Sequence, residues 1–216
     1  MSYKLAIFDL DGTVLDTLDD LANAVNHTLE VHNMPKRTLK EIRAILGNGA
    51  RNLIERSVPE GTDAAVTDDV FEYYQKYYRE HSEINTKPYD GIMDMLGTLK
   101  ERGVKLAVLS NKPDAAVQPL AKKYFPGIFD YVSGEKAGIV RKPAPDGIYE
   151  ALRVLDIPLE DTVFIGDSEV DIDTAKNASM DCISVCWGFR DADVLWDSGA
   201  TCVISTADAL LAEIIK

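Results

Sequence analysis

Two aspartates stand one residue apart directly after an apolar segment near the start of the chain. The segment AIFDLDGTVLDT covers residues 6–17, and in it Asp9 and Asp11 are followed by Gly12 and Thr13. Paired carboxylates in different surroundings can divide one reaction, one attacking an electrophile while the other carries a proton. Asp9 is the better placed nucleophile because a rigid strand would aim it, and Asp11, on the turn opened by Gly12, is the better proton carrier.

Three further segments carry polar, reactive side chains after apolar runs or in a loop between them. They are VKLAVLS (104–110), GIVRKPAPD (138–146) and TVFIGD (162–167). The side chains that stand out are Ser110, Asn111, Lys142, Asp167 and Asp171. In an open parallel sheet, ligands bind where the carboxyl ends of the strands meet. We therefore expect these side chains to gather with the two early aspartates in one site.

This set of residues suits a phosphate group held together with a hard divalent cation. Mg²⁺ prefers a few carboxylates completed by substrate phosphate and water. Four ionised aspartates repel a phosphate dianion, since each like-charge contact at about 4 Å costs about 4 kcal/mol at an effective dielectric constant near 20, and one lysine does not offset them. A bound cation would turn several of these repulsions into attractions. Gly12 would let the backbone approach the phosphate, and Ser110 would bind oxygens that gain charge in the transition state.

The elements that must position these residues follow an alternating pattern. Short β-rich runs, each followed by a helical pattern, occur at 4–9, 104–110, 129–134, 162–167, 182–187 and 201–205. This pattern predicts an α/β fold with a doubly wound parallel sheet and helices on both of its faces. About 90 residues separate the first two runs, whereas a crossover needs only about a dozen or two.

The long gap therefore predicts an insertion. Helical periodicity appears at 16–33, at 39–57 with a break at Gly47 and Gly49, and at 63–84. We expect an all-helical cap subdomain over residues 16–85. The catalytic α/β core would then comprise residues 1–15 and 86–216.

Composition limits the classes of partner. The chain has 216 residues, 46% of them hydrophobic, and a formal net charge of −13. This charge would repel nucleic acid and anionic membranes, which bind clustered Lys and Arg. No run reaches the ~18 apolar residues of a membrane span, and the start lacks the apolar stretch of a secretory signal. We expect a cytoplasmic protein, a monomer or homodimer, that binds neither nucleic acid nor membranes.

Four segments of the chain resemble, in order, the four motifs of the haloacid dehalogenase (HAD) superfamily. The matching segments are DLDGTVLD (9–16), VLSN (108–111), RKPAPD (141–146) and GDSEVD (166–171). The resemblance implies a Rossmann-like core with a helical cap inserted after the first motif. It implies Asp9 as the nucleophile and Asp11 as the general acid and base, with Lys142 orienting the nucleophile. The phosphate-binding candidates are Gly12, Thr13, Ser110 and Asn111.

The resemblance also implies a metal. Mg²⁺ would be held by the Asp9 carboxylate, the Asp11 backbone carbonyl and Asp167, and Asp171 would steady that set. Asp11 itself argues against the dehalogenases, which lack this second carboxylate.

Within the superfamily the chain is most similar to phosphoglycolate phosphatases, on the segments DTLDDLANAVN (16–26), SNKPD (110–114) and WGFR (187–190). This similarity implies a Mg²⁺-dependent phosphatase acting on a small phosphorylated metabolite, 2-phosphoglycolate above others, through an aspartyl-phosphate intermediate. The loop LGNGARNLI (46–54) would recognise the substrate, with Arg51 as the candidate for the substrate carboxylate. Its candidate residues are Gly47, Asn48, Gly49 and Arg51.

Three alternatives stay open. A sugar phosphomutase of the β-phosphoglucomutase type would keep the phosphoryl group, but such enzymes tend to carry a His where this chain has Leu21. Another small-metabolite or pyrophosphate phosphatase would share the core motifs. A non-enzymatic signalling module phosphorylated on Asp, as in response-regulator receivers, clusters similar residues, but receivers place the accepting Asp after a later strand and carry no helical cap.

Overall fold

The computed structural model describes residues 3–216, and the chain divides into two compact units. One unit, which we call the α/β unit, comprises Met1–Leu15 and Pro88–Lys216. The other, the helical unit, comprises Asp16–Lys87. Two short strands, β2 (Leu15–Asp16) and β3 (Lys87–Pro88), lie where the chain passes from one unit to the other.

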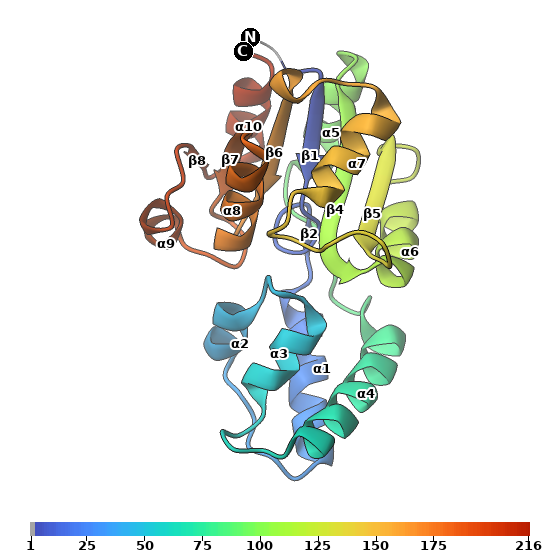
Figure 1. The fold of residues 1–216 in the computed structure, drawn as a ribbon, viewed down its shortest axis with the longest axis vertical. Coiled ribbons are helices and arrows are strands. Elements are labelled where there is room, and N and C mark those ends of the chain that lie inside the picture. The colour runs from blue at the N-terminus through green and yellow to red at the C-terminus, as the bar shows by residue number, and fades with distance from the viewer. Residues whose placement is uncertain (1–2) are drawn as a thin grey trace. The chain divides into compact units, whose positions relative to one another are not determined.

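The α/β unit is built on a sheet of six parallel strands within the described residues, in the order β5-β4-β1-β6-β7-β8 (Figure 1). The strands are β1 (Leu5–Phe8), β4 (Lys105–Pro113), β5 (Tyr131–Glu135), β6 (Thr162–Gly166), β7 (Asp181–Val185) and β8 (Val203–Ile204). The chain runs from β1 to β4 and β5 and then returns to the other side of β1 with β6. The predicted doubly wound parallel sheet is confirmed, and its topological switch point lies at β1, where such folds bind ligands.

Helices cover both faces of this sheet, as alternation along the strands requires. Ala6 and Phe8 share one apolar core with α5 (Ile92–Glu101), α6 (Asp114–Tyr124) and α10 (Ala207–Ile214). Leu5 and Ile7 point to the opposite face. There they pack with α7 (Asp146–Leu155) and α8 (Glu169–Ala178), the two helices drawn over the same face in Figure 1. The short helix α9 (Ala192–Asp197) and a 3₁₀ turn at Leu159–Asp161 complete the unit.

The helical unit contains α1 (Leu18–Val31), α2 (Leu39–Ile45), α3 (Gly49–Ser57) and α4 (Ala64–His81). Helix α2 begins with a capping box in which Thr38 and Glu41 satisfy each other's backbone N–H groups. The break between α2 and α3 falls at Gly47, whose φ of +110° is a left-handed conformation that favours glycine. Buried apolar side chains, including Leu29, Ile42 and Ile54, form its interior.

The last helix of this unit ends earlier than its periodicity predicts, at His81 instead of residue 84. The cause is Asp20 on α1, whose buried carboxylate accepts hydrogen bonds from the backbone N–H groups of residues 84–86 at 2.9–3.0 Å. The Asn85 amide and the Thr86 hydroxyl donate to the same carboxylate. These contacts draw the backbone out of the helix before it returns to the α/β unit.

None of the helices within residues 3–216 combines the length and the apolar character that crossing a membrane would require.

Candidate active site

A tight turn after β1 carries the first motif. The Leu10 carbonyl accepts hydrogen bonds from the backbone N–H groups of residues 13–15. Gly12 adopts φ +86°, and a Cβ at this position would lie 2.8 Å from Cγ of Asp167. Glycine is needed at this position for two reasons, the left-handed backbone and the close approach of a carboxylate.

Three buried aspartates lie together at the carboxyl ends of β1 and β6. One carboxylate oxygen from each of Asp9, Asp167 and Asp171 lies within 4.8 Å of the other two. The side chains of Asp9 and Asp171 are 10% and 1% exposed, and Asp167 is fully buried. The structure therefore brings together the carboxylates that the sequence assigns to the nucleophile and to the metal.

Lys142 reaches this cluster from the loop before α7. Its Nζ donates a hydrogen bond to Asp171 Oδ1 at 2.7 Å and lies 2.9 Å from Asp9 Oδ1. Two neighbouring carboxylates raise the pKa of the Lys142 ammonium although burial alone would lower it. The ammonium stays charged and bridges the Asp9 carboxylate to Asp171 in the first turn of α8.

Asp171 is held by the start of α8. Its Oδ2 accepts hydrogen bonds from the backbone N–H of Asp167, from the N–H of Ser168 at 3.1 Å and from the Ser168 hydroxyl at 2.7 Å. Together with Ser168 it forms the capping box of this helix. With Oδ1 on Lys142 and Oδ2 on these donors, Asp171 orients the other members of the cluster.

Asp167 is oriented by a segment that the sequence did not single out as part of the site. Its Oδ2 accepts a hydrogen bond from the backbone N–H of Phe189 at 2.6 Å, and its Oδ1 accepts one from the Thr13 hydroxyl at 3.2 Å. The neighbouring Gly188 packs so closely that a Cβ there would lie 2.6 Å from Cβ of Asp167. Thr13, predicted to bind phosphate, thus lies on a carboxylate of the cluster.

The charge balance of the cluster fits a cation. Burial, reinforced by the neighbouring Asp171, raises the pKa of Asp9 to about 7 even though Lys142 opposes the shift. Burial raises the pKa of Asp167 well above its usual range for the same reasons. One ammonium does not neutralise three buried carboxylates, so the cluster has the oxygen ligands and the negative charge that suit a hard divalent cation.

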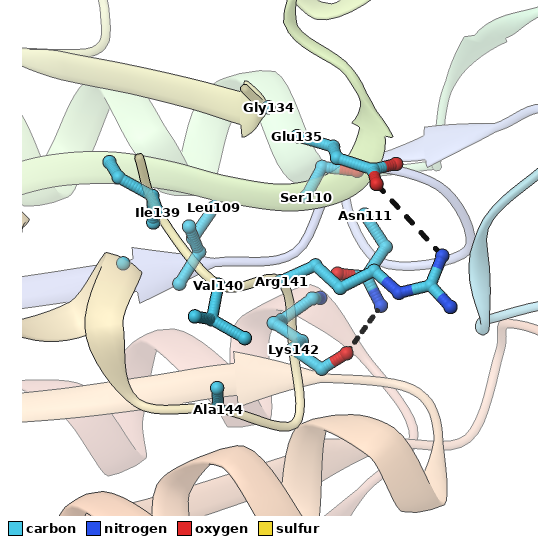
Figure 2. Close-up of a pocket in the computed structure, with 11 residues that line it drawn as sticks. Leu109, Ser110, Asn111, Gly134, Glu135, Ile139, Val140, Arg141, Lys142 and Ala144 are labelled. Atoms are coloured by element: carbon cyan, nitrogen blue, oxygen red, sulfur yellow. Dashed lines mark hydrogen bonds and ion pairs between the residues drawn. The ribbon is translucent and has the colours of Figure 1, made fainter. Parts of the chain in front are cut away.

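Ser110 and Asn111 lie on β4, which extends to Pro113 and not to residue 110 as the sequence predicts. The pairing of β4 with β5 shifts register between Leu109 and Pro113, and such irregularities re-aim side chains beside active sites. The Asn111 amide donates to the Lys142 carbonyl at 3.0 Å. Figure 2 shows a small pocket lined by Ser110, Asn111 and the loop that carries Lys142.

Asp11 lies next to a lysine that sequence reasoning missed. Nζ of Lys112 donates to both carboxylate oxygens of Asp11, at 2.9 and 3.2 Å. The Lys112 side chain is 5% exposed and that of Asp11 15% exposed. The signal in the sequence was the segment SNKPD (110–114), which contains Lys112 and is similar to phosphoglycolate phosphatases.

The candidates in the helical unit have local roles. Gly47 and Gly49 both have positive φ, and Asn48 is the N-cap of α3. Arg51 on α3 donates hydrogen bonds to Glu55 and Asp68, each at 2.6 Å. The residue predicted to bind a substrate carboxylate therefore already pairs with two carboxylates of its own unit.

A parallel α/β sheet with buried aspartates, a lysine and a serine at its switch point is a site suited to phosphate chemistry. A family model described as haloacid dehalogenase-like hydrolase matches residues 6–185. A phosphoglycolate phosphatase from Pseudomonas syringae pv. tomato is 30% identical over 96% of this chain and 78% of its own length. One from Colwellia psychrerythraea is 31% identical over 96% of this chain and 95% of its own length.

Among solved structures, a protein from Lactobacillus delbrueckii subsp. bulgaricus, provisionally described as a phosphoglycolate phosphatase, superposes with a TM-score of 0.95. It is 41% identical and the match covers 100% of this chain and 99% of that one. The chain belongs to the haloacid dehalogenase-like hydrolase family, and it is a phosphatase of that family.

Proposed function

We propose that this phosphatase uses Mg²⁺ and hydrolyses 2-phosphoglycolate through an aspartyl phosphate on Asp9. The observation that carries the proposal is the geometry of Asp9, a buried carboxylate at a strand end that is oriented by Lys142 and adjoins two further carboxylates. The names of relatives that match nearly the whole chain support the substrate.

The first step transfers the phosphoryl group to the protein. A carboxylate oxygen of Asp9 attacks phosphorus while the bond to the alkyl oxygen breaks, and Asp11 gives its proton to that leaving oxygen. Glycolate leaves, and the phosphoryl group stays on Asp9. Ser110, whose Oγ accepts a hydrogen bond from the Lys112 backbone N–H at 3.2 Å, is turned by that contact so that its own proton can serve a phosphoryl oxygen.

The second step releases phosphate. Asp11, now a carboxylate, takes a proton from water as the water oxygen attacks phosphorus, and the bond between phosphorus and the Asp9 oxygen breaks. Asp9 returns as a carboxylate and Asp11 as the acid, so protons and phosphate balance over the cycle.

The metal would be held by the Asp9 carboxylate, the Asp11 backbone carbonyl and Asp167. When bound it neutralises charge that would otherwise repel the phosphate. Asp171 contributes by holding Lys142 and the backbone of Asp167 in place.

We propose the helical unit as the cap that selects the substrate, with the loop around Gly47, Asn48, Gly49 and Arg51 as its recognition segment. To reach a substrate carboxylate, Arg51 would have to exchange its pairs with Glu55 and Asp68. That exchange makes Arg51 a weaker anchor than the sequence suggests.

Phosphate release from a panel of phosphorylated metabolites, compared by kcat/KM with and without Mg²⁺, tests the proposal. We expect 2-phosphoglycolate to lead the panel. The variant Asp9→Asn should lose about 10³-fold or more in kcat, whereas Asp161→Asn, at a surface pair with Lys4, should not. Activity that survives Asp9→Asn or the removal of Mg²⁺ would contradict the mechanism. In ¹⁸O-enriched water the label should appear in free phosphate, which a phosphomutase would not produce.

A further inference from the structure

The site contains two buried ammonium groups with different carboxylate partners. Lys142 lies on Asp171 and Asp9, the side of the cluster where the nucleophile and the metal oxygens are. Lys112 lies on Asp11, and its ammonium contacts both oxygens of that carboxylate. The mechanism above uses the Lys142 ammonium and makes no use of the Lys112 ammonium. A buried lysine is costly unless it has anionic partners, and Asp11 supplies one. Because Asp11 is the proposed proton donor, Lys112 also lies beside the leaving group of the substrate.

The local backbone aims Lys112 into the site. The register shift of β4 against β5 falls between Leu109 and Pro113, so Ser110 and Lys112 both face the strand ends that meet there. Gly134 on β5 lets the backbone that follows β4 approach β5 closely, because a Cβ on Gly134 would lie 2.6 Å from the Cα of Asp114. The Gly134 backbone N–H in turn donates to the Asp114 carboxylate at 2.8 Å.

The position of Asp11 in the proposed reaction locates the leaving group. A proton donor must lie at about 2.7 Å from the oxygen it protonates. Lys112 lies 2.9 Å from Asp11 Oδ1, so its ammonium is within about 6 Å of the leaving oxygen. In 2-phosphoglycolate the carboxylate follows that oxygen after a single CH₂ group, roughly 3 Å away. A substrate that extends toward Lys112 would therefore bring its carboxylate within contact distance of the ammonium.

We propose that Lys112 binds the second anionic group of the substrate and so selects phosphomonoesters that carry a carboxylate one carbon from the leaving oxygen. This inference rests on the proposed function, since it takes Asp11 as the group beside the leaving oxygen. An ammonium has three donors and can hold a second carboxylate beside or in place of Asp11. Lys112 belongs to the same unit as Asp9 and Asp11, whereas Arg51 is engaged with Glu55 and Asp68 in the helical unit.

The experiment compares two alkyl phosphates whose leaving groups differ only beyond the first carbon. 2-Phosphoglycolate carries the carboxylate, and 2-hydroxyethyl phosphate has a neutral hydroxymethyl group in its place. The variant Lys112→Met should lower kcat/KM for 2-phosphoglycolate by about 10- to 100-fold, the effect of losing one hydrogen bond between charged groups, mainly through KM. For 2-hydroxyethyl phosphate the change should stay within about threefold.

Two control variants accompany it. Lys105→Met removes another lysine of β4, one whose ammonium pairs with Asp130 at the surface. It should leave kcat/KM for both substrates unchanged. Arg51→Met removes the other candidate for binding the substrate carboxylate, and it should lower the preference for 2-phosphoglycolate less than Lys112→Met does. Retained hydrolysis of 2-hydroxyethyl phosphate shows that each variant is folded, and Lys112→Gln replaces Lys112→Met if the latter is not.

Several results would overturn the inference. An equal loss on both substrates would mean that Lys112 acts through Asp11 or only supports the fold. An unchanged preference in the Lys112 variants, or a larger selective loss in Arg51→Met than in Lys112→Met, would assign the carboxylate to another group. The proposed function fails separately, if the wild-type protein releases no Mg²⁺-dependent phosphate from either substrate or if Asp9→Asn retains that activity.

Discussion

The variant Gly188→Ala tests whether the loop after β7 sets the position of Asp167, the carboxylate that we propose as a metal ligand. A methyl group on Gly188 would lie 2.6 Å from Cβ of Asp167, and closer still to its Oδ2 and to the Gly12 carbonyl. Ordinary van der Waals contact begins at 3.4 Å, so the loop must move at least 0.8 Å from Cβ of Asp167, and further from the Gly12 carbonyl. The same movement disturbs the 2.6 Å hydrogen bond from the Phe189 N–H to Asp167.

Displacements of about 1 Å in a catalytic group can cost about 10²-fold in rate. We therefore expect Gly188→Ala to lower kcat/KM about 10²-fold and to raise the Mg²⁺ concentration needed for half-maximal activity. Mg²⁺ titrations of phosphate release measure both quantities. Gly97→Ala is the matched control, because Gly97 lies in α5 with no atom within 4 Å of its added Cβ. Wild-type kinetics and Mg²⁺ dependence in Gly188→Ala would refute the assigned position of the loop.

Two further predictions concern stability. The pKa of Asp9 is raised to about 7 in the fold, so between about pH 4 and pH 7 the unfolded chain binds fewer protons than the folded one. The Tm of the metal-free protein should therefore fall as the pH rises through this window. Mg²⁺ should restore the Tm most at the upper end of the window, and thermal scans in which the Tm rises across it would contradict this contribution. In the helical unit, Asp20→Ala removes a buried carboxylate that accepts hydrogen bonds from the backbone N–H groups of residues 84–86. It should lower the free energy of unfolding, measured in urea, by about 3 kcal/mol. Asp19→Ala, at an exposed position in the same turn, should lower it little, and equal effects would show that the Asp20 contacts contribute nothing specific.

The gathering of the candidate site residues at one edge of the sheet was predictable because these residues follow strands. Asp9, Ser110 and Asp167 each come directly after or at the end of an apolar run, and parallel strands bring such ends together. The insertion was predictable from the length of the gap between the first two strands. Both inferences need only local patterns and one topological rule.

Other features depend on contacts between distant parts of the chain, which a single sequence does not reveal. Lys112 meets Asp11 across 101 residues, and Asp20 meets residues 84–86 across 64 to 66 residues. Gly188 matters only because the loop after β7 folds against Asp167. The partners of Arg51 likewise include Asp68 on another helix, and these pairs redirect a residue that looked suited to a substrate.

The identity of the nucleophile is the central claim, and trapping the covalent intermediate tests it most directly. The protein is mixed with Mg²⁺ and 2-phosphoglycolate, quenched in acid during turnover and reduced with borohydride, which converts an aspartyl phosphate to homoserine. Mass spectrometry of the peptide that contains AIFDLDGTVLDT should find the conversion at residue 9 and nowhere else. Conversion at Asp11 or Asp167, or turnover without any converted aspartate, would contradict the account.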